Sequence, residues 1–121
     1  KNVEHIFVKT GDEKIMVYEV SSKEHAANFS KHSGNVNCLD ISLDGKYLIS
    51  CGMDGNICIW DISDKALGII NQAEKRPANF FPIKDFSEKE PILSVVFTNL
   101  SKDLAFLAVS SSGKIFTLTK N

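Results

Sequence analysis

Residues 31–61 read KHSGNVNCLDISLDGKYLISCGMDGNICIWD, and this stretch decides the fold. It holds three short apolar runs of β-strand length, each bounded by Gly, Asp or Asn, at residues 36–41, 47–50 and 57–60. The pairs Asp44-Gly45 and Asp54-Gly55 separate the runs and are typical of tight hairpins, because Gly tolerates positive φ. The stretch therefore predicts a three-stranded antiparallel meander. Neighbouring elements must cover it, because a meander cannot bury both of its faces alone.

Four polar or aromatic residues of the stretch have spacings that identify the type of repeat more specifically than the strand pattern does. His32 lies 22 residues before Asp54, Ser50 lies four before it, and Trp60 lies six after it. With Asp61 following Trp60, the stretch resembles a WD40 repeat, the blade unit of a β-propeller. The resemblance implies that these four side chains form a buried hydrogen-bonded tetrad. Lys31 departs from the family pattern, which usually has Gly before the His to ease a turn.

The same pattern recurs upstream in a degenerate form. Strands are predicted at residues 5–8 and 15–20, around a turn at 11–14. Tyr18 lies six residues after Asp12, as Trp60 lies six after Asp54, so Tyr18 takes the Trp position and Val8 the Ser position.

Downstream, a third copy keeps the apolar pattern and loses the polar one. Strands are predicted at residues 92–97, 104–109 and 115–118, with Ser112-Gly113 in the turn. Ala108 then takes the Ser position and Leu118 the Trp position. Packing alone must hold this copy together.

The remaining segments fit the outer parts of blades. Residues 26–30 and 79–83 fit the fourth, outer strand of a blade. Residues 61–77 are the least regular part, and within them residues 66–73 are either a short helix or a long rim loop. Gly68 and Pro77 argue against an extended structure there.

We therefore predict an all-β fold built of WD40 β-propeller blades, one complete and two partial. The predicted bounds are 1–30 for the first, partial blade, 31–85 for the complete blade, and 86–121 for the last, partial blade. Known propellers have roughly 4–8 blades of about 40 residues each, so 121 residues cannot close one. We expect a segment of a larger propeller, without the innermost strand of its first blade and the outermost strand of its last. The alternative is a small protein that completes its sheets with a partner strand.

Composition excludes several function classes. The net charge is −1 and charges of both signs are interspersed, so direct nucleic-acid binding is not indicated. No apolar run reaches membrane-spanning length. Cys38, Cys51 and Cys58 are odd in number and fall in predicted strands, which favours buried free thiols in an intracellular protein. No close Cys pair indicates a metal site, and we expect no cofactor.

Two groups of residues resemble known functional sites, a catalytic triad and a calcium-binding loop. Ser50, His32 and Asp54 are the residue types of a hydrolase triad, and a propeller-framed enzyme is the alternative functional hypothesis. A mid-strand Ser held between Trp60 and His32 would be neither exposed nor activated, so we expect no catalytic residue. Residues 40–45 resemble the start of a calcium loop, but the twelfth position is Cys51 and the flanks are strands, so a hairpin is expected and no metal site.

The favoured hypothesis is a scaffold that binds other proteins of a multisubunit intracellular complex. The family pattern places partner contacts next to the first strand of each blade and before the tetrad Asp. In the complete blade these are Asn35, Asn37 and Met53, and in the last blade Leu93, with Pro91 and Ser111 beside it. Apolar Met53 and Leu93 would supply adaptable contacts and the Asn pair polar ones.

The last copy also resembles the final blades of a WD-repeat subunit of the small-subunit processome. The residues that carry this resemblance are 90–93 and 107–115. It implies a role in ribosome small-subunit biogenesis and a location in the nucleus or nucleolus, with the cytoplasm as the alternative.

Overall fold

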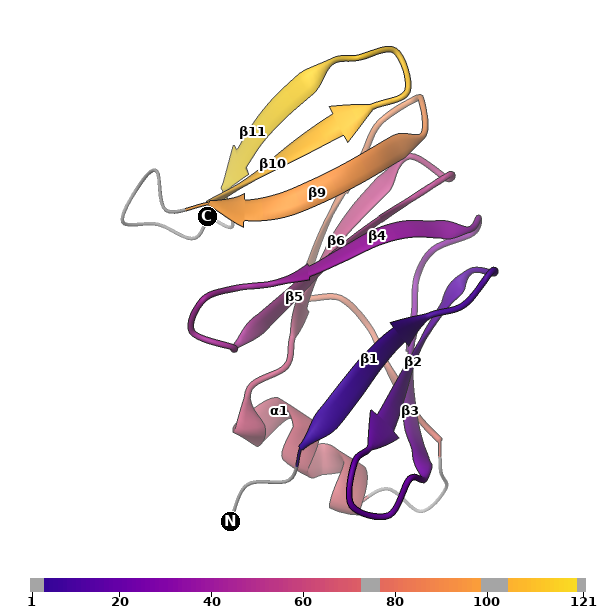
Figure 1. The fold of residues 1–121 in the computed structure, drawn as a ribbon, viewed down its shortest axis with the longest axis vertical. Coiled ribbons are helices and arrows are strands. Elements are labelled where there is room, and N and C mark those ends of the chain that lie inside the picture. The colour runs from indigo at the N-terminus through magenta and orange to yellow at the C-terminus, as the bar shows by residue number, and fades with distance from the viewer. Residues whose placement is uncertain (1–3, 73–76, 99–104, 120–121) are drawn as a thin grey trace.

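The computed structural model describes residues 4–72, 77–98 and 105–119, and their strands form three sheets (Figure 1). The strands are β1 (His5–Lys9), β2 (Lys14–Glu19), β3 (His25–Ser30), β4 (Val36–Ile41), β5 (Tyr47–Gly52), β6 (Asn56–Asp61), β7 (Ala78–Phe80), β8 (Lys84–Ser87), β9 (Ile92–Thr98), β10 (Ala105–Ser110) and β11 (Ile115–Thr119). A short helix, α1 (Asp64–Leu67), continues into a 3-10 turn, η1 (Gly68–Gln72).

Each sheet is built on an antiparallel meander of three consecutive strands, and the first two sheets each gain a fourth strand from further along the chain. The first sheet has the order β1-β2-β3-β7, the central sheet β4-β5-β6-β8, and the last sheet β11-β10-β9. They follow one another along the long axis of the described chain, with the central sheet between the other two (Figure 1). This is the all-β arrangement of successive propeller blades that the sequence predicts.

The strand registers show that the three sheets repeat one another. In the central sheet Trp60 lies opposite Leu48. In the first sheet Tyr18 lies opposite Ile6, and in the last sheet Leu118 lies opposite Phe106. Strands β1, β5 and β10 are therefore equivalent, as are β2, β6 and β11.

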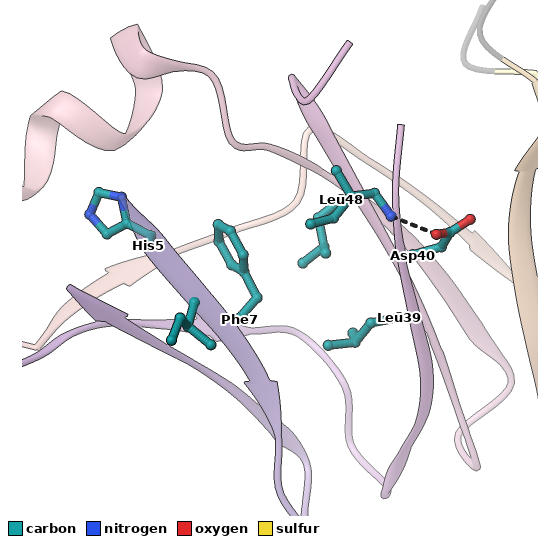
Figure 2. Close-up of a pocket in the computed structure, with 7 residues that line it drawn as sticks. His5, Phe7, Leu39, Asp40 and Leu48 are labelled. Carbon is teal, nitrogen blue, oxygen red and sulfur yellow. Dashed lines mark hydrogen bonds between the residues drawn. The ribbon is translucent and has the colours of Figure 1, made fainter. Parts of the chain in front are cut away.

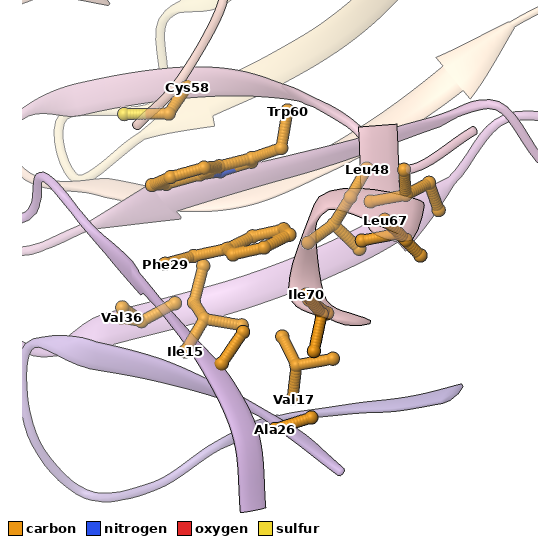
Figure 3. Close-up of a cluster of buried hydrophobic side chains, with 12 residues drawn as sticks. Ile15, Val17, Ala26, Phe29, Val36, Leu48, Cys58, Trp60, Leu67 and Ile70 are labelled. Carbon is orange, nitrogen blue, oxygen red and sulfur yellow. The ribbon is translucent and has the colours of Figure 1, made fainter. Parts of the chain in front are cut away.

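Two buried apolar clusters join the sheets. The cluster between the first and central sheets holds Ile15, Val17, Ala26, Ala27, Phe29, Val36, Leu48, Cys58, Trp60, Ile62, Leu67 and Ile70 (Figure 3). At its centre the Phe29 ring stacks on the Trp60 indole, with ring centroids 4.6 Å apart. The cluster between the central and last sheets holds Ile49, Cys51, Ile57, Ile59, Ile92, Val95, Phe106 and Ala108. Full burial of one such aliphatic or aromatic side chain is worth about 1.5–3 kcal/mol, so these clusters are the main attraction between sheets.

The prediction that residues 79–83 form the outer strand of the central blade is wrong. Residues Ala78–Phe80 form β7, which pairs in parallel with β3 of the first sheet, and β8 is the outer strand of the central sheet instead. The reason is apolar packing, because Phe80 lies against Phe29, with ring centroids 5.5 Å apart. Phe81 and Ile83, which follow β7, remain 72% and 49% exposed.

The irregular segment forms a short helix, one of its two predicted structures. Ser63 starts it two residues earlier than expected, because its hydroxyl accepts a hydrogen bond from the N–H of Ala66 at 3.3 Å. Leu67 and Ile70 then enter the first buried cluster. Residue 73, the predicted end, lies outside the described residues.

Both predicted Asp-Gly turns are present, with φ of +73° at Gly45 and +81° at Gly55. They differ in what surrounds the glycine. Gly45 has open space around it, whereas a Cβ at Gly55 would collide with the backbone carbonyl oxygen of Glu88. The N–H of Glu88 also donates to the Gly55 carbonyl at 2.8 Å, so the end of β8 closes directly onto this turn.

We expect Gly55→Ala to destabilise the protein far more than Gly45→Ala. Both changes place a Cβ on a left-handed residue, which costs about 1–2 kcal/mol. Only Gly55→Ala adds a collision with fixed backbone, worth about another 1–3 kcal/mol as overpacking. Urea unfolding of the two variants measures the difference, and equal losses would show that β8 does not close onto this turn.

Candidate functional site

The four residues of the predicted tetrad meet in the central sheet. The indole N–H of Trp60 donates to Ser50 Oγ at 2.9 Å, and His32 Nε2 lies 2.8 Å from the same oxygen. His32 Nδ1 lies 3.1 Å from both carboxylate oxygens of Asp54. A carboxylate only accepts, so Nδ1 carries the proton and Nε2 accepts the Ser50 hydroxyl hydrogen. The chain of bonds runs without a break from Trp60 to Asp54.

Asp54 fastens two loops to this chain of bonds. Its carboxylate accepts from the N–H of Ser33 at 2.8 Å and from the backbone N–H and side-chain amide of Asn56 at 3.1 and 3.0 Å. Burial alone would raise the pKa of Asp54, but these donors and His32 outweigh it and hold the pKa below its usual value. The ionised carboxylate therefore joins the segment before β4 to the β5–β6 turn.

The Ser50 hydroxyl is closed off from solvent. Ser50 is fully buried and His32 is 6% exposed. The Ser50 oxygen is bonded on both sides, to Trp60 and to His32. A nucleophile needs exposure and donors aimed at the developing oxyanion, so this arrangement serves to hold the sheet together.

The calcium-like segment forms the β4–β5 hairpin. Asp44 accepts from the Ser42 hydroxyl at 2.7 Å and from the Lys46 N–H at 3.0 Å. Asp40 points elsewhere and accepts from the N–H of Phe97 in β9 at 2.9 Å. In the described part of the chain, no group of three or more His, Cys, Asp or Glu side chains could hold a metal ion.

The residues predicted to bind partners lie at one end of the sheets. This end, which we call the loop face, is formed by the turns β1–β2, β5–β6 and β10–β11 and by the starts of β4 and β9, on the right in Figure 1. Met53 is 50% and Leu93 49% exposed there. Asn35 is also exposed, and its carbonyl accepts from the Met53 N–H at 2.9 Å.

Asn37 lies at the loop face but is engaged within the chain. Its side-chain amide donates to the carbonyl of Ile92 at 2.8 Å, across the boundary between the central and last sheets. Together with the bond from Phe97 to Asp40, it forms a polar seam between β4 and β9. Nothing in the spacing of the sequence pointed to this seam.

Sequence reasoning also missed two residues of the loop face. Glu90 accepts from the N–H of Ser112 at 2.8 Å and lies 3.8 Å from Lys114 Nζ. Hydrogen bonds from the side chain and the N–H of Ser112 lower the pKa of Glu90 to about 2. Ile115, at the start of β11, is 70% exposed and adds a third apolar side chain to this end. The signal for Glu90 was its place opposite a Ser-Ser-Gly turn, which can offer several donors to a carboxylate.

A cavity of about 450 Å³ lies beside β1. His5, Ile6 and Phe7 of β1 face Leu39, Asp40 and Ile41 of β4 and Leu48 of β5 across it (Figure 2). Strand β1 forms one edge of the first sheet. Its equivalents β5 and β10 carry β4 and β9 on that side. The cavity therefore occupies the place of an innermost strand of the first sheet.

Comparisons with known proteins agree with this geometry. Residues 23–61 match the WD40 family, described as the WD domain, G-beta repeat. The structure resembles the β-propeller domain of Cps50 (Swd1) from Myceliophteria thermophila, with a TM-score of 0.72 and 16% identity, over 97% of this chain and 32% of that chain. Residues 23–61 are thus similar to a WD40 repeat, and the chain has the fold of β-propeller blades.

Curated relatives match over about half of the chain or less. Transducin beta-like protein 2 of Homo sapiens is 40% identical over 52 residues, 43% of this chain and 12% of that protein. Transcription factor unc-37 of Caenorhabditis elegans is 30% identical over 60 residues, 50% of this chain and 10% of that protein. Small ribosomal subunit protein RACK1 of Neurospora crassa is 33% identical over 60 residues, 49% of this chain and 19% of that protein. The matched stretch is a small part of each relative.

We expect Ser50→Ala and Trp60→Phe each to lower the free energy of unfolding by about 1–3 kcal/mol, because each leaves a buried partner unsatisfied. The double variant should lose less than the sum, since both changes break the same bond. Denaturant unfolding of the four proteins measures this. Tyr18→Phe is the matched control: the Tyr18 hydroxyl has only a weak 4.0 Å contact with Met16 Sδ, and we expect under about 0.5 kcal/mol. Strict additivity would show that Ser50 and Trp60 act independently.

We expect Ser50 to resist a serine-directed phosphonate. Its hydroxyl is fully buried and occupied by two partners, so it is neither exposed nor activated. Mass spectrometry of the folded protein should find no adduct on the peptide that holds Ser50. Stoichiometric labelling at Ser50 would restore the hydrolase hypothesis.

Proposed function

We propose that this chain is part of a WD40 propeller scaffold that binds other proteins through its loop face. The observation that carries the proposal is that three exposed apolar side chains, Met53, Leu93 and Ile115, gather at one end of the three sheets. Apolar side chains about half or more exposed at one end of a rigid frame are typical of protein-binding surfaces. Loops on such frames carry function because the sheets below hold them in place.

The hydrogen bonds behind these side chains support this assignment. The Asp54 carboxylate fixes the turn that presents Met53, and the Asn37 amide holds the Ile92 carbonyl just before Leu93. Glu90 fixes the β10–β11 turn beside them through the Ser112 N–H. A partner would meet a surface that is already ordered, which lowers the entropic cost of binding.

We further infer that a strand from the rest of a propeller, or from a partner protein, fills the cavity beside β1. Each wall presents apolar side chains beside one polar residue, His5 or Asp40, and Ile6 and Ile41 are 52% and 44% exposed. A strand there would pair with the open edge of β1 and cover both side chains. This is the relation that β4 has to β5 in the central sheet.

A narrower proposal is that the complex is one that builds the small ribosomal subunit in the nucleus or nucleolus. Its support is the resemblance of residues 90–93 and 107–115 to the final blades of a processome subunit. One relative, RACK1 of Neurospora crassa, is named a small ribosomal subunit protein, and that name describes the relative alone. The cytoplasm is the alternative location.

We expect the double variant Met53→Gln, Leu93→Gln of the full protein to lose its partners, with co-purified partner proteins falling about tenfold or more, because a hot-spot contact is worth about 2 kcal/mol or more. Quantitative mass spectrometry of affinity-purified protein measures this. Leu43→Gln is the matched control, since Leu43 is 85% exposed in the β4–β5 turn at the opposite end. Equal losses in the control, or none in the double variant, would overturn the loop-face assignment.

The same purification separates the narrower proposals. Precursor ribosomal RNA of the small subunit should co-purify with the wild-type protein, and its absence would exclude the ribosomal role while leaving the scaffold proposal intact.

A photo-crosslinking residue in place of Ile6 should capture the strand beside β1 and identify the chain that supplies it.

A further inference from the structure

Two of the three cysteines lie opposite one another on neighbouring strands. Cys38 in β4 and Cys51 in β5 are direct partners in the antiparallel register. Both face the last sheet: Cys51 belongs to the second buried cluster, and Cys38 packs against it. Cys58 in β6 lies opposite Ser50 and faces the first cluster, on the other side of the sheet.

This pairing suits a covalent bond between the two sulfurs. Opposed residues of antiparallel strands have Cα atoms about 4.5–5.5 Å apart, inside the range of about 4.4–6.8 Å that a disulfide spans. The register also shifts between Val36 and Cys38, and such bulges increase the local twist and re-aim side chains.

The Cys38 thiol is only weakly held where it is. Its sulfur lies 3.8 Å from the Leu39 carbonyl and 3.8 Å from Ser94 Oγ, and 3.7 Å from the Val95 carbonyl. Sulfur is a weak hydrogen-bond partner, so a rotation that leaves these contacts costs little. Cys38 is half-buried, whereas Cys51 is fully buried, so a reagent from solvent reaches Cys38 first.

We propose that Cys38 and Cys51 form a modification site, at which a low-molecular-weight disulfide such as oxidised glutathione converts the two thiols into a cross-strand disulfide.

The chemistry proceeds by two thiol–disulfide exchanges. The Cys38 thiolate attacks one sulfur of oxidised glutathione, the S–S bond breaks, and one glutathione leaves as a thiolate that takes up a proton. The Cys51 thiolate then attacks the Cys38 sulfur of the mixed disulfide and releases the second glutathione. Two protein thiols are oxidised, and one glutathione disulfide is reduced to two glutathione thiols.

The surroundings of Cys38 and Cys51 determine which thiol reacts first and which of the two exchange steps is slow. Burial raises the pKa of Cys51 to about 12, and burial likewise raises the pKa of Cys58 to about 12. Cys38 acts first because it is the more exposed of the two, and the attack by Cys51 is the slow step because only the thiolate is nucleophilic. That second step should therefore speed up as the pH rises.

The bond would alter the contact between the central and last sheets. Turned toward Cys51, the Cys38 sulfur leaves Ser94 and Val95 of β9, while the bonds from Asn37 and to Asp40 remain. Oxidation should therefore loosen the contact of β4 with β9 around Cys38, and leave the Asn37–Ile92 and Phe97–Asp40 hydrogen bonds on either side in place. The lost contacts are at the Ser94 hydroxyl and the Val95 carbonyl, so amide exchange along β9 reports the loosening of the strand rather than the contacts themselves.

The test incubates the full folded protein with excess oxidised glutathione, blocks remaining thiols with iodoacetamide, and maps peptides by mass spectrometry without reduction. We expect a Cys38–Cys51 linked peptide, absent in Cys38→Ser, with linkages to Cys58 at least about tenfold lower because Cys58 is on the other face. Cys58→Ala should leave the yield unchanged. Hydrogen exchange at Ser94 and Val95 should rise several-fold on oxidation, relative to Phe97 at the retained bond to Asp40.

Three results would overturn the proposal. One is a Cys38–glutathione adduct that persists above pH 9 without conversion to the linked peptide. Another is linkage of Cys38 to Cys58 at a yield equal to that with Cys51. The third is no adduct or linkage at Cys38 at all while the protein remains folded. Since Cys38 is half-buried, Cys38→Ser is expected to fold, and a Cys51 variant that fails to fold does not affect the test.

Discussion

The hydrogen bond from the Trp60 indole to the buried Ser50 hydroxyl is the constraint on which the central sheet depends. It fixes the indole plane, and the plane receives the stacked ring of Phe29 from the first sheet. It also turns the Ser50 oxygen toward His32, which carries the chain of bonds to Asp54 and so to the loop face. The indole N–H of Trp60 thus influences both the packing between the first two sheets and the position of the exposed turn that holds Asp54. Buried polar chains have this effect only when every member is satisfied, and here each one is.

The outer sheets show what replaces this bond when it is missing. Ala108 and Leu118 stand at the positions of Ser50 and Trp60, so the last sheet has neither the donor nor the acceptor. The Glu90 carboxylate instead fixes its β10–β11 turn from outside. In the first sheet Tyr18 stacks on His25, with ring centroids 5.3 Å apart. Equivalent backbone positions are held by a core bond in one sheet and by surface contacts in the others.

The sequence predicted the features that depend on local patterns. The Asp-Gly turns, the strands around them and the meeting of His32, Ser50, Asp54 and Trp60 follow from spacings of 22 residues or fewer. The polar seam involves partners 55 and 57 residues apart, and a single sequence contains no pattern that pairs them. Residues 79–83 were misplaced because an apolar strand of three to five residues fits the edge of either sheet. Packing of Phe80 on Phe29 decided between the two, and that depends on the assembled structure.

The excursion of the chain between β6 and β8 has a consequence for how the molecule opens. After β6 the chain leaves the central sheet, places Leu67 and Ile70 in the first cluster, adds β7 to the first sheet, and returns as β8. The first and central sheets are thereby interlaced, so they cannot separate without undoing either the β3–β7 pairing of the first sheet or the β6–β8 pairing of the central one. The last sheet has no such crossing among the described residues, and only its own cluster and the seam hold it. Thermal fluctuations should therefore divide the structure unequally, with the first two sheets behaving as one cooperative folding unit and the third able to detach as a separate one.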